Sequence, residues 1–246
     1  MDDEQLLRYS RQIMLPQCGI EGQERLRQAS VLIVGMGGLG APLAMYLAAS
    51  GVGKLILTDD DQVDLSNLQR QILFATTDVG QPKVDAARRH LEALNPEVRF
   101  ETYNKRLNGD KLAEVVRGVD AVVDASDNFV TRFLLNRVCQ LQAKPLISAA
   151  VIRMEGQVSV FRLDQAESPC YRCLYEDTKE LAESCSESGV IGSVVGIMGS
   201  IQATETIKVL LDIGTTLVGR VMLLDAERME WHTVKLSKDP NCPVCS

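Results

Sequence analysis

The sequence predicts an α/β fold in which a doubly wound, mostly parallel sheet is extended by antiparallel strands. Three observations carry this prediction. Short apolar runs alternate with helical patterns over the first 150 residues, as a parallel sheet with crossover helices requires. A glycine-rich turn follows the first of these runs. Strict alternation of apolar and polar residues begins only after residue 153, which indicates antiparallel strands there.

The first strand–helix–strand unit spans residues 31–61 and organises the chain. Four apolar residues, Val31 to Val34, predict a buried strand. A small-residue helical pattern follows, with Leu43 and Leu47 on one face. A second apolar run, Leu55 to Leu57, ends in three consecutive aspartates. This order is typical of a βαβ unit.

The turn in this unit carries a nucleotide-binding pattern. Gly35, Gly37 and Gly40 fit the spacing G-x-G-x-x-G, in which the glycines allow a tight turn, the approach of a ligand and close helix packing. Asp59 lies about 20 residues further on, where an acid commonly binds ribose hydroxyls. The pattern predicts a Rossmann-like fold that binds an adenine nucleotide, but it does not separate NAD from ATP. The alternative is the same unit without a ligand.

The remaining elements follow from periodicity and from turn residues. We expect one domain over 1–246, made of an N-terminal helical arm (1–28), a nucleotide-binding half (29–150) and a second half (151–246). The expected helices cover 83–95, 109–116, 131–141 and 199–211, and the first helix of the arm includes Leu6 to Gln12. The expected strands are 98–103, 120–124, 146–150, 157–161, 219–225 and 230–236.

Composition narrows the class of protein. The net charge of −7 over 246 residues argues against general nucleic-acid binding. Charged residues throughout positions 1–15 argue against a secretory signal. The most apolar long stretch, Val190 to Ile201, is too short to span a membrane and contains glycines, so we expect a buried helix or a subunit contact. These features favour a cytoplasmic protein that binds neither nucleic acid nor membrane.

Two cysteine pairs predict a metal site. Cys170 and Cys173 form one C-x-x-C pair, and Cys242 and Cys245 form a second at the end of the sequence. In a reducing compartment, two such pairs are typical of a tetrahedral four-cysteine zinc site rather than of disulfides. With four thiolates the metal has no open position, so it should be structural. The alternatives are a redox C-x-x-C or accidental spacing.

The other cysteines carry less information. Cys139 lies in a helical apolar pattern and should be a core residue, and Cys18 lies in an N-terminal loop. Cys185 lies in a polar stretch between Glu183 and Glu187, which predicts an exposed thiol. Acidic neighbours disfavour a thiolate, so composition alone makes Cys185 a bystander.

Polar residues gather after several predicted strands. Ser66 to Gln71 follow the aspartates, and Asp124 to Asn128 follow the strand over 120–124. Because the carboxyl ends of parallel strands bind ligands in open sheets, both clusters are candidates for one site. Lys83 opens a helix, where its charge opposes the helix dipole unless a phosphate binds there.

Six separated motifs together resemble the MoeB/ThiF/HesA family, bacterial relatives of the ubiquitin-activating enzymes. The motifs are GMGGLG, DDDQVDLSNLQRQ, GQPK, DASDN, CYRC and CPVC, and the similarity extends from RYSRQI to the last cysteine pair. The resemblance implies ATP- and magnesium-dependent adenylation of the C-terminal Gly-Gly carboxylate of a ubiquitin-like sulfur carrier. IRMEGQ is more similar to MoeB, which serves molybdopterin synthesis through a MoaD-like carrier. DDDQVDLSNLQRQILF is as similar to ThiF, which serves thiamine synthesis through a ThiS-like carrier.

The resemblance also implies roles for single residues. Asp59 would hold the ribose, Lys83 would stabilise charge on the phosphates, and Asp127 would bind magnesium. Arg11 would reach the triphosphate from the other subunit of a homodimer, and Cys185 would match a loop cysteine that some relatives use covalently. With the motif glycines, the expected nucleotide-contacting set is Gly35, Gly37, Gly38, Gly40, Asp59, Asp61, Ser66, Asn67, Leu68, Gln69, Arg70, Gln71, Lys83, Asp127 and Asn128.

The implied chemistry agrees with the residues available. A C-terminal carboxylate has a pKa of about 3.5, so it is ionised at neutral pH and needs no general base. The sequence lacks a G-x-x-x-x-G-K-[S/T] loop, so scattered side chains must hold the triphosphate. A separate sulfur donor, such as a cysteine desulfurase or a rhodanese, is expected. The alternatives from other classes are an NAD-dependent dehydrogenase and a zinc-stabilised binding module without activity.

Overall fold

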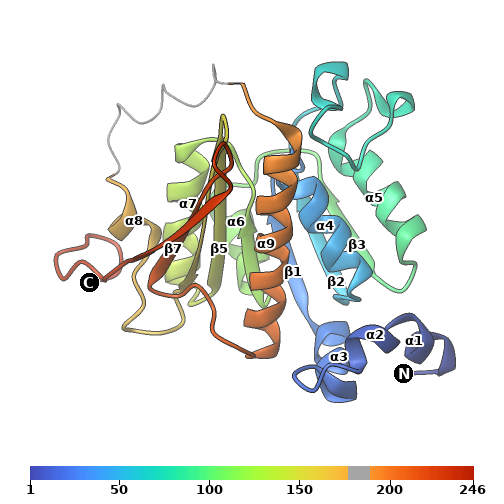
Figure 1. Cartoon of the computed structure of the whole chain (residues 1–246), viewed down its shortest axis with the longest axis horizontal. Coiled ribbons are helices and arrows are strands. Elements are labelled where there is room, and N and C mark those ends of the chain that lie inside the picture. The colour runs from blue at the N-terminus through green and yellow to red at the C-terminus, as the bar shows by residue number, and fades with distance from the viewer. Residues whose placement is uncertain (177–188) are drawn as a thin grey trace.

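The computed structural model describes residues 1–176 and 189–246, and over these residues eight strands form one sheet (Figure 1). The strand order is β3-β2-β1-β4-β5-β6-β7-β8. The first five strands in this order pair in parallel, and β6, β7 and β8 pair antiparallel. The strands are β1 (Ser30–Val34), β2 (Lys54–Thr58), β3 (Arg99–Tyr103), β4 (Ala121–Asp124), β5 (Pro145–Ile152), β6 (Glu155–Arg162), β7 (Arg220–Asp225) and β8 (Glu230–Lys235).

Helices cover both faces of the sheet, and the sheet separates the hydrophobic core into two clusters. Residues of β1 alternate between them, since Val31 and Ile33 pack with α4, α5 and α9 while Leu32 packs with α6 and α7. The predicted doubly wound fold is therefore confirmed. The helices are α1 (Asp3–Arg8), α2 (Ser10–Ile13), α3 (Gly19–Gln28), α4 (Gly40–Ala49), α5 (Lys83–Leu94), α6 (Gly109–Arg117), α7 (Phe129–Leu141), α8 (Tyr171–Leu174) and α9 (Gly192–Leu211).

Helix α9 begins earlier than predicted. It starts at Gly192 rather than Gly199, so the apolar stretch Val190 to Ile201 largely forms its first half. Gly199 lies inside the helix and serves packing there. An added Cβ at Gly199 would lie 2.6 Å from the Leu39 backbone oxygen, which shows how closely α9 packs on the start of α4. By length and composition α9 could cross a membrane, but 56% of its most apolar window is buried, as in a core helix.

The N-terminal arm is three short helices, so the prediction of one helix through Gln12 is wrong. Helix α1 ends at Arg8, and Arg11 and Gln12 lie in α2. The break falls at Tyr9, which is buried and accepts a hydrogen bond from Asn95 Nδ2 at 2.9 Å. Burying this ring against the body of the protein requires the chain to turn.

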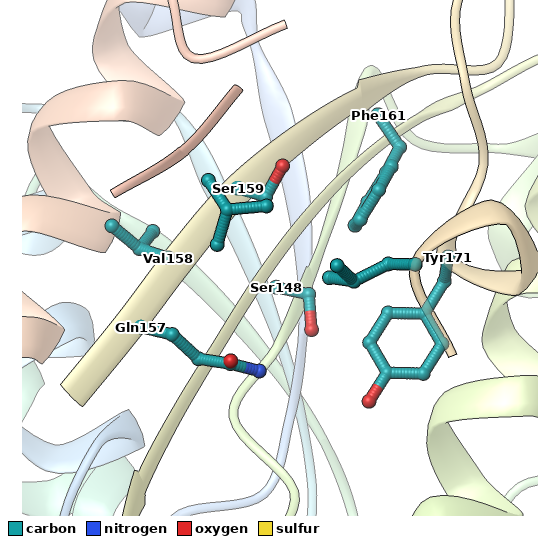
Figure 2. A pocket seen from close by; sticks show the side chains of 8 residues that line it. Ser148, Gln157, Val158, Ser159, Phe161 and Tyr171 are labelled. Carbon is teal, nitrogen blue, oxygen red and sulfur yellow. The ribbon is translucent and has the colours of Figure 1, made fainter. Parts of the chain in front are cut away.

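Strand β6 does not alternate in burial as its sequence predicts, although its antiparallel pairing is as expected. Ser159 is buried with its apolar neighbours, and its hydroxyl donates to the Arg220 carbonyl at 2.8 Å. Figure 2 shows that Ser159, Ser148 and Tyr171 all border one cavity of about 10 Å³. That volume has room for about one water molecule.

Candidate functional site

A cleft of about 880 Å³ opens at the carboxyl ends of β1, β2 and β4. The strand order reverses between β1 and β4, because β2 lies on one side of β1 and β4 on the other. Open α/β sheets bind ligands at this kind of switch point. The volume lies within the usual range for a small-molecule site.

Most of the predicted site residues line this cleft. Arg11, Gly40, Ser66 and Leu68 are not among the residues that line it. The predicted residues that do are Gly35, Gly37, Gly38, Asp59, Asp61, Asn67, Gln69, Arg70, Gln71, Lys83, Asp127 and Asn128.

Backbone contacts leave no space for a side chain at two of the three motif glycines. Gly35 has a φ of +95°, and an added Cβ there would lie 2.7 Å from the Ala125 oxygen. At Gly40 an added Cβ would lie 2.0 Å from the Gly35 oxygen. At Gly37 the nearest atom would be 3.7 Å away, on the Gln71 side chain. Gly35 and Gly40 therefore allow close packing of the backbone, whereas Gly37 lines the cleft without such a clash.

Asp59 is fixed beside this turn. One of its carboxylate oxygens accepts a hydrogen bond from the Met36 amide at 2.7 Å, and the other accepts one from the Asp61 amide at 2.9 Å. Burial raises the pKa of Asp59, and the Lys83 charge and these two amides offset only part of that effect. The carboxylate is thus oriented at the end of β2, where a ribose would lie in a Rossmann-like site.

Lys83 is a buried cation in the cleft wall. It is the first residue of α5 and only 4% exposed, and its Nζ lies 2.7 Å from Asp61 Oδ2. The sequence raised the objection that a lysine opposes the dipole at this position. The nearby Asp61 carboxylate offsets this unfavourable interaction, since it supplies the negative charge that the start of a helix favours.

Buried polar groups at the end of β4 and in α7 hold the loop that follows β4. Asp124 is fully buried, and burial raises its pKa. It accepts hydrogen bonds from the Ser126 hydroxyl at 2.6 Å and the Ser148 hydroxyl at 3.0 Å. Arg132 donates to the Ser126 carbonyl at 2.8 Å. This network fixes the backbone just before Asp127.

Asp127 and Asn128 line the cleft and lie directly after that fixed loop. Asn128 is the N-cap of α7, and its Oδ1 accepts from the Thr131 amide at 2.9 Å. Its Nδ2 lies 3.3 Å from Asp127 Oδ1. Asp127 is exposed and lines the cleft, so its carboxylate can accept a cation. Carboxylate oxygens are the ligands that Mg²⁺ prefers.

The segment after β2 adds a cation and an amide. Arg70 donates to the Ser66 carbonyl at 3.2 Å, so Ser66 contacts a residue of the cleft wall but does not itself line the cleft. Gln71 is 3% exposed, and its Oε1 is buried without a hydrogen-bond partner among the described residues. A buried amide with an unused acceptor is costly unless a ligand completes it.

Sequence reasoning missed the segment after β3. Lys105, Arg106, Leu107 and Asn108 all line the cleft. Arg106 Nε lies 3.0 Å from both carboxylate oxygens of Asp60. The signal was available, because these residues follow a strand as the predicted polar clusters do. Leu112 and Leu135 add an apolar wall on the same side.

Arg11 lies far from the cleft of its own chain. Helices α1 to α3 lie at the end of the sheet where β1 begins, opposite the carboxyl ends (Figure 1). Gln12, the next residue, donates to the Ser50 carbonyl at the end of α4 at 3.2 Å. The arginine is exposed. Contribution of Arg11 to a cleft by way of a second subunit stays a prediction, and Cys185 lies outside the described residues.

The four paired cysteines meet in one cluster. The Cys170 and Cys242 sulfurs are 3.6 Å apart, and those of Cys173 and Cys245 are 3.5 Å apart. All four lie within 4.8 Å of one another. A disulfide needs about 2.05 Å, whereas Zn–S bonds of about 2.3 Å in a tetrahedron place sulfurs about 3.8 Å apart. The cluster therefore fits a tetrahedral thiolate-bound metal such as zinc and excludes disulfide pairing in this arrangement.

Comparison with curated proteins finds similar chains along nearly the whole sequence. A sulfur carrier protein adenylyltransferase of Thermus thermophilus is 47% identical, over 98% of this chain and 91% of the relative. A sulfur carrier protein ThiS adenylyltransferase of Escherichia coli is 44% identical, over 100% of this chain and 97% of the relative. A molybdopterin-synthase adenylyltransferase of Salmonella typhimurium is 45% identical, over 100% and 98%.

Structural comparison agrees with this similarity. The crystal structure of E. coli MccB with succinimide matches with a TM-score of 0.86 at 27% identity, over 97% of this chain and 74% of MccB. The ThiF family model matches residues 9–244. The resemblance carried by the six motifs is thereby confirmed, and this chain belongs to the ThiF family.

Proposed function

We propose that this protein adenylates the C-terminal carboxylate of a ubiquitin-like sulfur-carrier protein, using ATP and releasing pyrophosphate. The observation that carries the proposal is the convergence of Asp59, Lys83, Arg70 and Asp127 in one cleft beside the glycine turn. The three relatives named above are adenylyltransferases by name, and each matches this chain over nearly its full length.

The reaction needs charge neutralisation more than proton transfer. A carboxylate oxygen of the carrier forms a bond to the α-phosphorus of ATP, and the bond to the bridging oxygen of pyrophosphate breaks. Lys83 and Arg70 supply positive charge at the cleft wall, where negative charge builds on the phosphates. Asp61 would release part of its hold on Lys83 as phosphate takes its place beside the ammonium.

Magnesium fits the oxygen-rich side of the cleft. Asp127 would hold the ion, with Asn128 beside it, and one carboxylate is enough because Mg²⁺ keeps most of its ligands from phosphate and water. When bound, the ion neutralises phosphate charge. Asp127 itself is held in place by the loop that Arg132 and Asp124 fix from below.

The adenosine would occupy the other end of the cleft. Asp59 has two oriented oxygens whose remaining lone pairs can accept ribose hydroxyls. Leu107, Leu112 and Leu135 offer an apolar wall against which an adenine ring can pack.

The proposal also covers which carrier the protein activates and which pathway it serves. We propose a MoaD-like carrier of molybdopterin synthesis, supported by IRMEGQ at the turn between β5 and β6, with a ThiS-like carrier of thiamine synthesis as the alternative. The relatives from both pathways are almost equally identical, at 45% and 44%. The proposal also includes a cytoplasmic homodimer in which Arg11 serves the partner's cleft, a separate sulfur donor, and a sulfur-transfer role for Cys185.

A structural zinc ion completes the proposal. It would be held by Cys170, Cys173, Cys242 and Cys245, which come from two segments about 70 residues apart and fit a closed four-thiolate shell. Because the shell leaves no open position, zinc would fasten the C-terminal segment to α8 and take no part in adenylation.

The residues that line the cleft do not support the alternative function, an NAD-dependent dehydrogenase. Hydride transfer commonly uses a histidine as acid or base, and the chain has two histidines. His90 pairs with Asp78 at 2.7 Å, and His232 lies on the exposed edge strand β8. Neither lines the cleft.

ATP–pyrophosphate exchange with magnesium tests the proposed function. The assay uses purified Gly-Gly-ended carriers, including the molybdopterin-synthase small subunit and the thiamine carrier. Exchange with the first alone supports the molybdopterin branch, and exchange with the second alone moves the protein to the thiamine branch. Absence of exchange with every carrier, while ATP still binds, contradicts adenylation of this carrier class.

The sulfur-transfer role of Cys185 has its own test. Full sulfur transfer by Cys185→Ala in a reconstituted system would remove the role proposed for that thiol.

A further inference from the structure

Helix α7 carries a buried amide that faces the first cysteine pair. Asn136 is only 1% exposed. Its Oδ1 accepts a hydrogen bond from the Tyr171 backbone amide at 2.9 Å, and its Nδ2 lies 3.5 Å from Cys170 Sγ, within range of an N–H donor to sulfur. One side chain therefore binds both the sulfur and the backbone of the segment that presents it.

The backbone contact replaces a missing helix cap. Helix α8 begins at Tyr171, and Cys170 precedes it without a capping hydrogen bond from its own side chain. The first amides of a helix need acceptors, and Asn136 supplies one from another element. This contact orients the turn at the start of α8, which carries both Cys170 and Cys173.

The second cysteine of this pair, Cys173, also accepts an N–H contact at its sulfur. The Asp239 backbone amide donates to Cys173 Sγ at 3.4 Å. Four thiolates outweigh one Zn²⁺ in charge, so a bound centre stays negative and N–H donors to sulfur stabilise it. Groups that orient metal ligands in this way commonly change metal affinity by about 10- to 100-fold when they are removed.

The same face of α7 leads to the nucleotide cleft. Asn128, Arg132 and Asn136 are spaced by four residues and so lie on one side of the helix. Asn128 caps the helix at the cleft, and Arg132 holds the Ser126 carbonyl. Helix α7 thus joins the cysteine cluster to the loop that carries Asp127.

We propose that Asn136 is a positioning residue of the metal site. It holds the Cys170 thiolate and the first turn of α8 in the geometry that zinc requires, and it anchors that geometry on α7. This inference rests on the proposed zinc binding and goes beyond it, because it assigns a residue outside the cysteine motifs to metal retention.

Aromatic packing is the competing explanation for the order of this segment. The Tyr171 ring lies 5.4 Å from Phe133 and 5.9 Å from Phe161, measured between ring centroids. Figure 2 shows Tyr171 reaching from its helix toward the strands beside Phe161. If these rings alone fix the pair, loss of the amide donor at position 136 leaves metal binding unchanged.

Three variants of the full-length protein separate these explanations. Asn136→Asp keeps an acceptor for the Tyr171 amide but removes the donor to Cys170 and adds a negative charge near the thiolates. Asn136→Ala removes both contacts. Gln140→Ala truncates an amide one turn further along the same helix and serves as the matched control. Asn136→Asp is nearly isosteric, so it keeps the test decisive even where Asn136→Ala fails to fold.

The measurement is the rate of zinc release from the purified, zinc-loaded protein to a chromophoric chelator. We expect Asn136→Asp to release zinc at least about tenfold faster than wild type, and Gln140→Ala to stay within about twofold. In the cobalt-substituted protein, the sulfur-to-metal charge-transfer band should shift in Asn136→Asp and not in Gln140→Ala. Wild-type release rates and an unshifted band in Asn136→Asp would overturn the role of Asn136. A wild-type protein that holds no zinc would instead overturn the metal site itself.

Discussion

Gly40 offers a sharp test of how the glycine turn shapes the cleft. In Gly40→Ala the new Cβ would lie 2.0 Å from the Gly35 oxygen, whereas real Cβ atoms essentially never approach within 3.0 Å. The start of α4 and the turn must therefore separate by about 1 Å. A misplacement of about 1 Å can cost about 100-fold in rate, because reacting groups lose their alignment.

The expected result is a loss of carrier-dependent ATP–pyrophosphate exchange of about 100-fold, together with a loss of about 1–3 kcal/mol in the free energy of unfolding from overpacking. Urea unfolding and the exchange rate measure the two effects separately. The matched control is Gly196→Ala in α9, where an added Cβ meets no atom of the residues that the structure describes within 4 Å. It should stabilise the protein by up to about 1 kcal/mol through helix propensity and leave exchange unchanged. Exchange within about threefold of wild type in Gly40→Ala, at unchanged stability, would show that close packing at Gly40 does not control the alignment of the cleft.

Three further predictions concern Lys83, Asp78 and the cysteine cluster. Lys83→Gln should lower the exchange rate by about 10²–10³-fold, because it removes a positive charge beside the phosphates. The free energy of unfolding should change by at most about 1 kcal/mol, because the ion-pair partner of Lys83, Asp61, has a side chain that is 62% exposed. A large loss of stability with intact exchange would contradict the role assigned to Lys83. Burial alone would raise the pKa of Asp78, but the Ala75 amide, His90 and Arg89 together lower it, so the stabilisation exists above about pH 4 and disappears as pH falls below it. Asp78→Asn should therefore cost about 1–3 kcal/mol at pH 7, with the difference from wild type narrowing in urea titrations under acid conditions, and a pH-independent difference would be the contrary result. Removing zinc with a chelator, or replacing Cys242 by Ser, should lower the thermal midpoint by at least about 6 °C, and an unchanged midpoint would argue against a structural metal.

The parallel half of the fold was predictable because its signals are local. Buried strands such as Val31 to Val34 are continuous apolar runs, and the glycine turn and the aspartates that follow β2 lie at their ends. The cleft followed from the rule that carboxyl ends of parallel strands lie together. The residues 105–108 obey the same rule after β3, but they match no named motif and were missed.

The remaining differences depend on tertiary contacts. The start of α9 was misplaced because glycine signals both a helix boundary and close packing, and only the neighbouring Leu39 backbone shows which applies to Gly199. The break in the N-terminal arm depends on burial of Tyr9 against Asn95, which lies 86 residues away. The partnership of Lys83 with Asp61 is equally non-local, joining residues 22 positions apart.

Trapping of the acyl-adenylate with hydroxylamine is a direct test of whether this protein activates a carrier carboxylate. Hydroxylamine converts an activated carboxyl group to a hydroxamate, so a carrier incubated with the protein, ATP, magnesium and hydroxylamine should gain a hydroxamate at its C-terminal glycine, detectable by intact-protein and peptide mass spectrometry. We expect this product only with ATP, and about 10²–10³-fold less of it with Lys83→Gln. An unmodified carrier C-terminus across the carrier panel, with a protein that binds ATP and is fully folded, would rule out adenylation of these carriers.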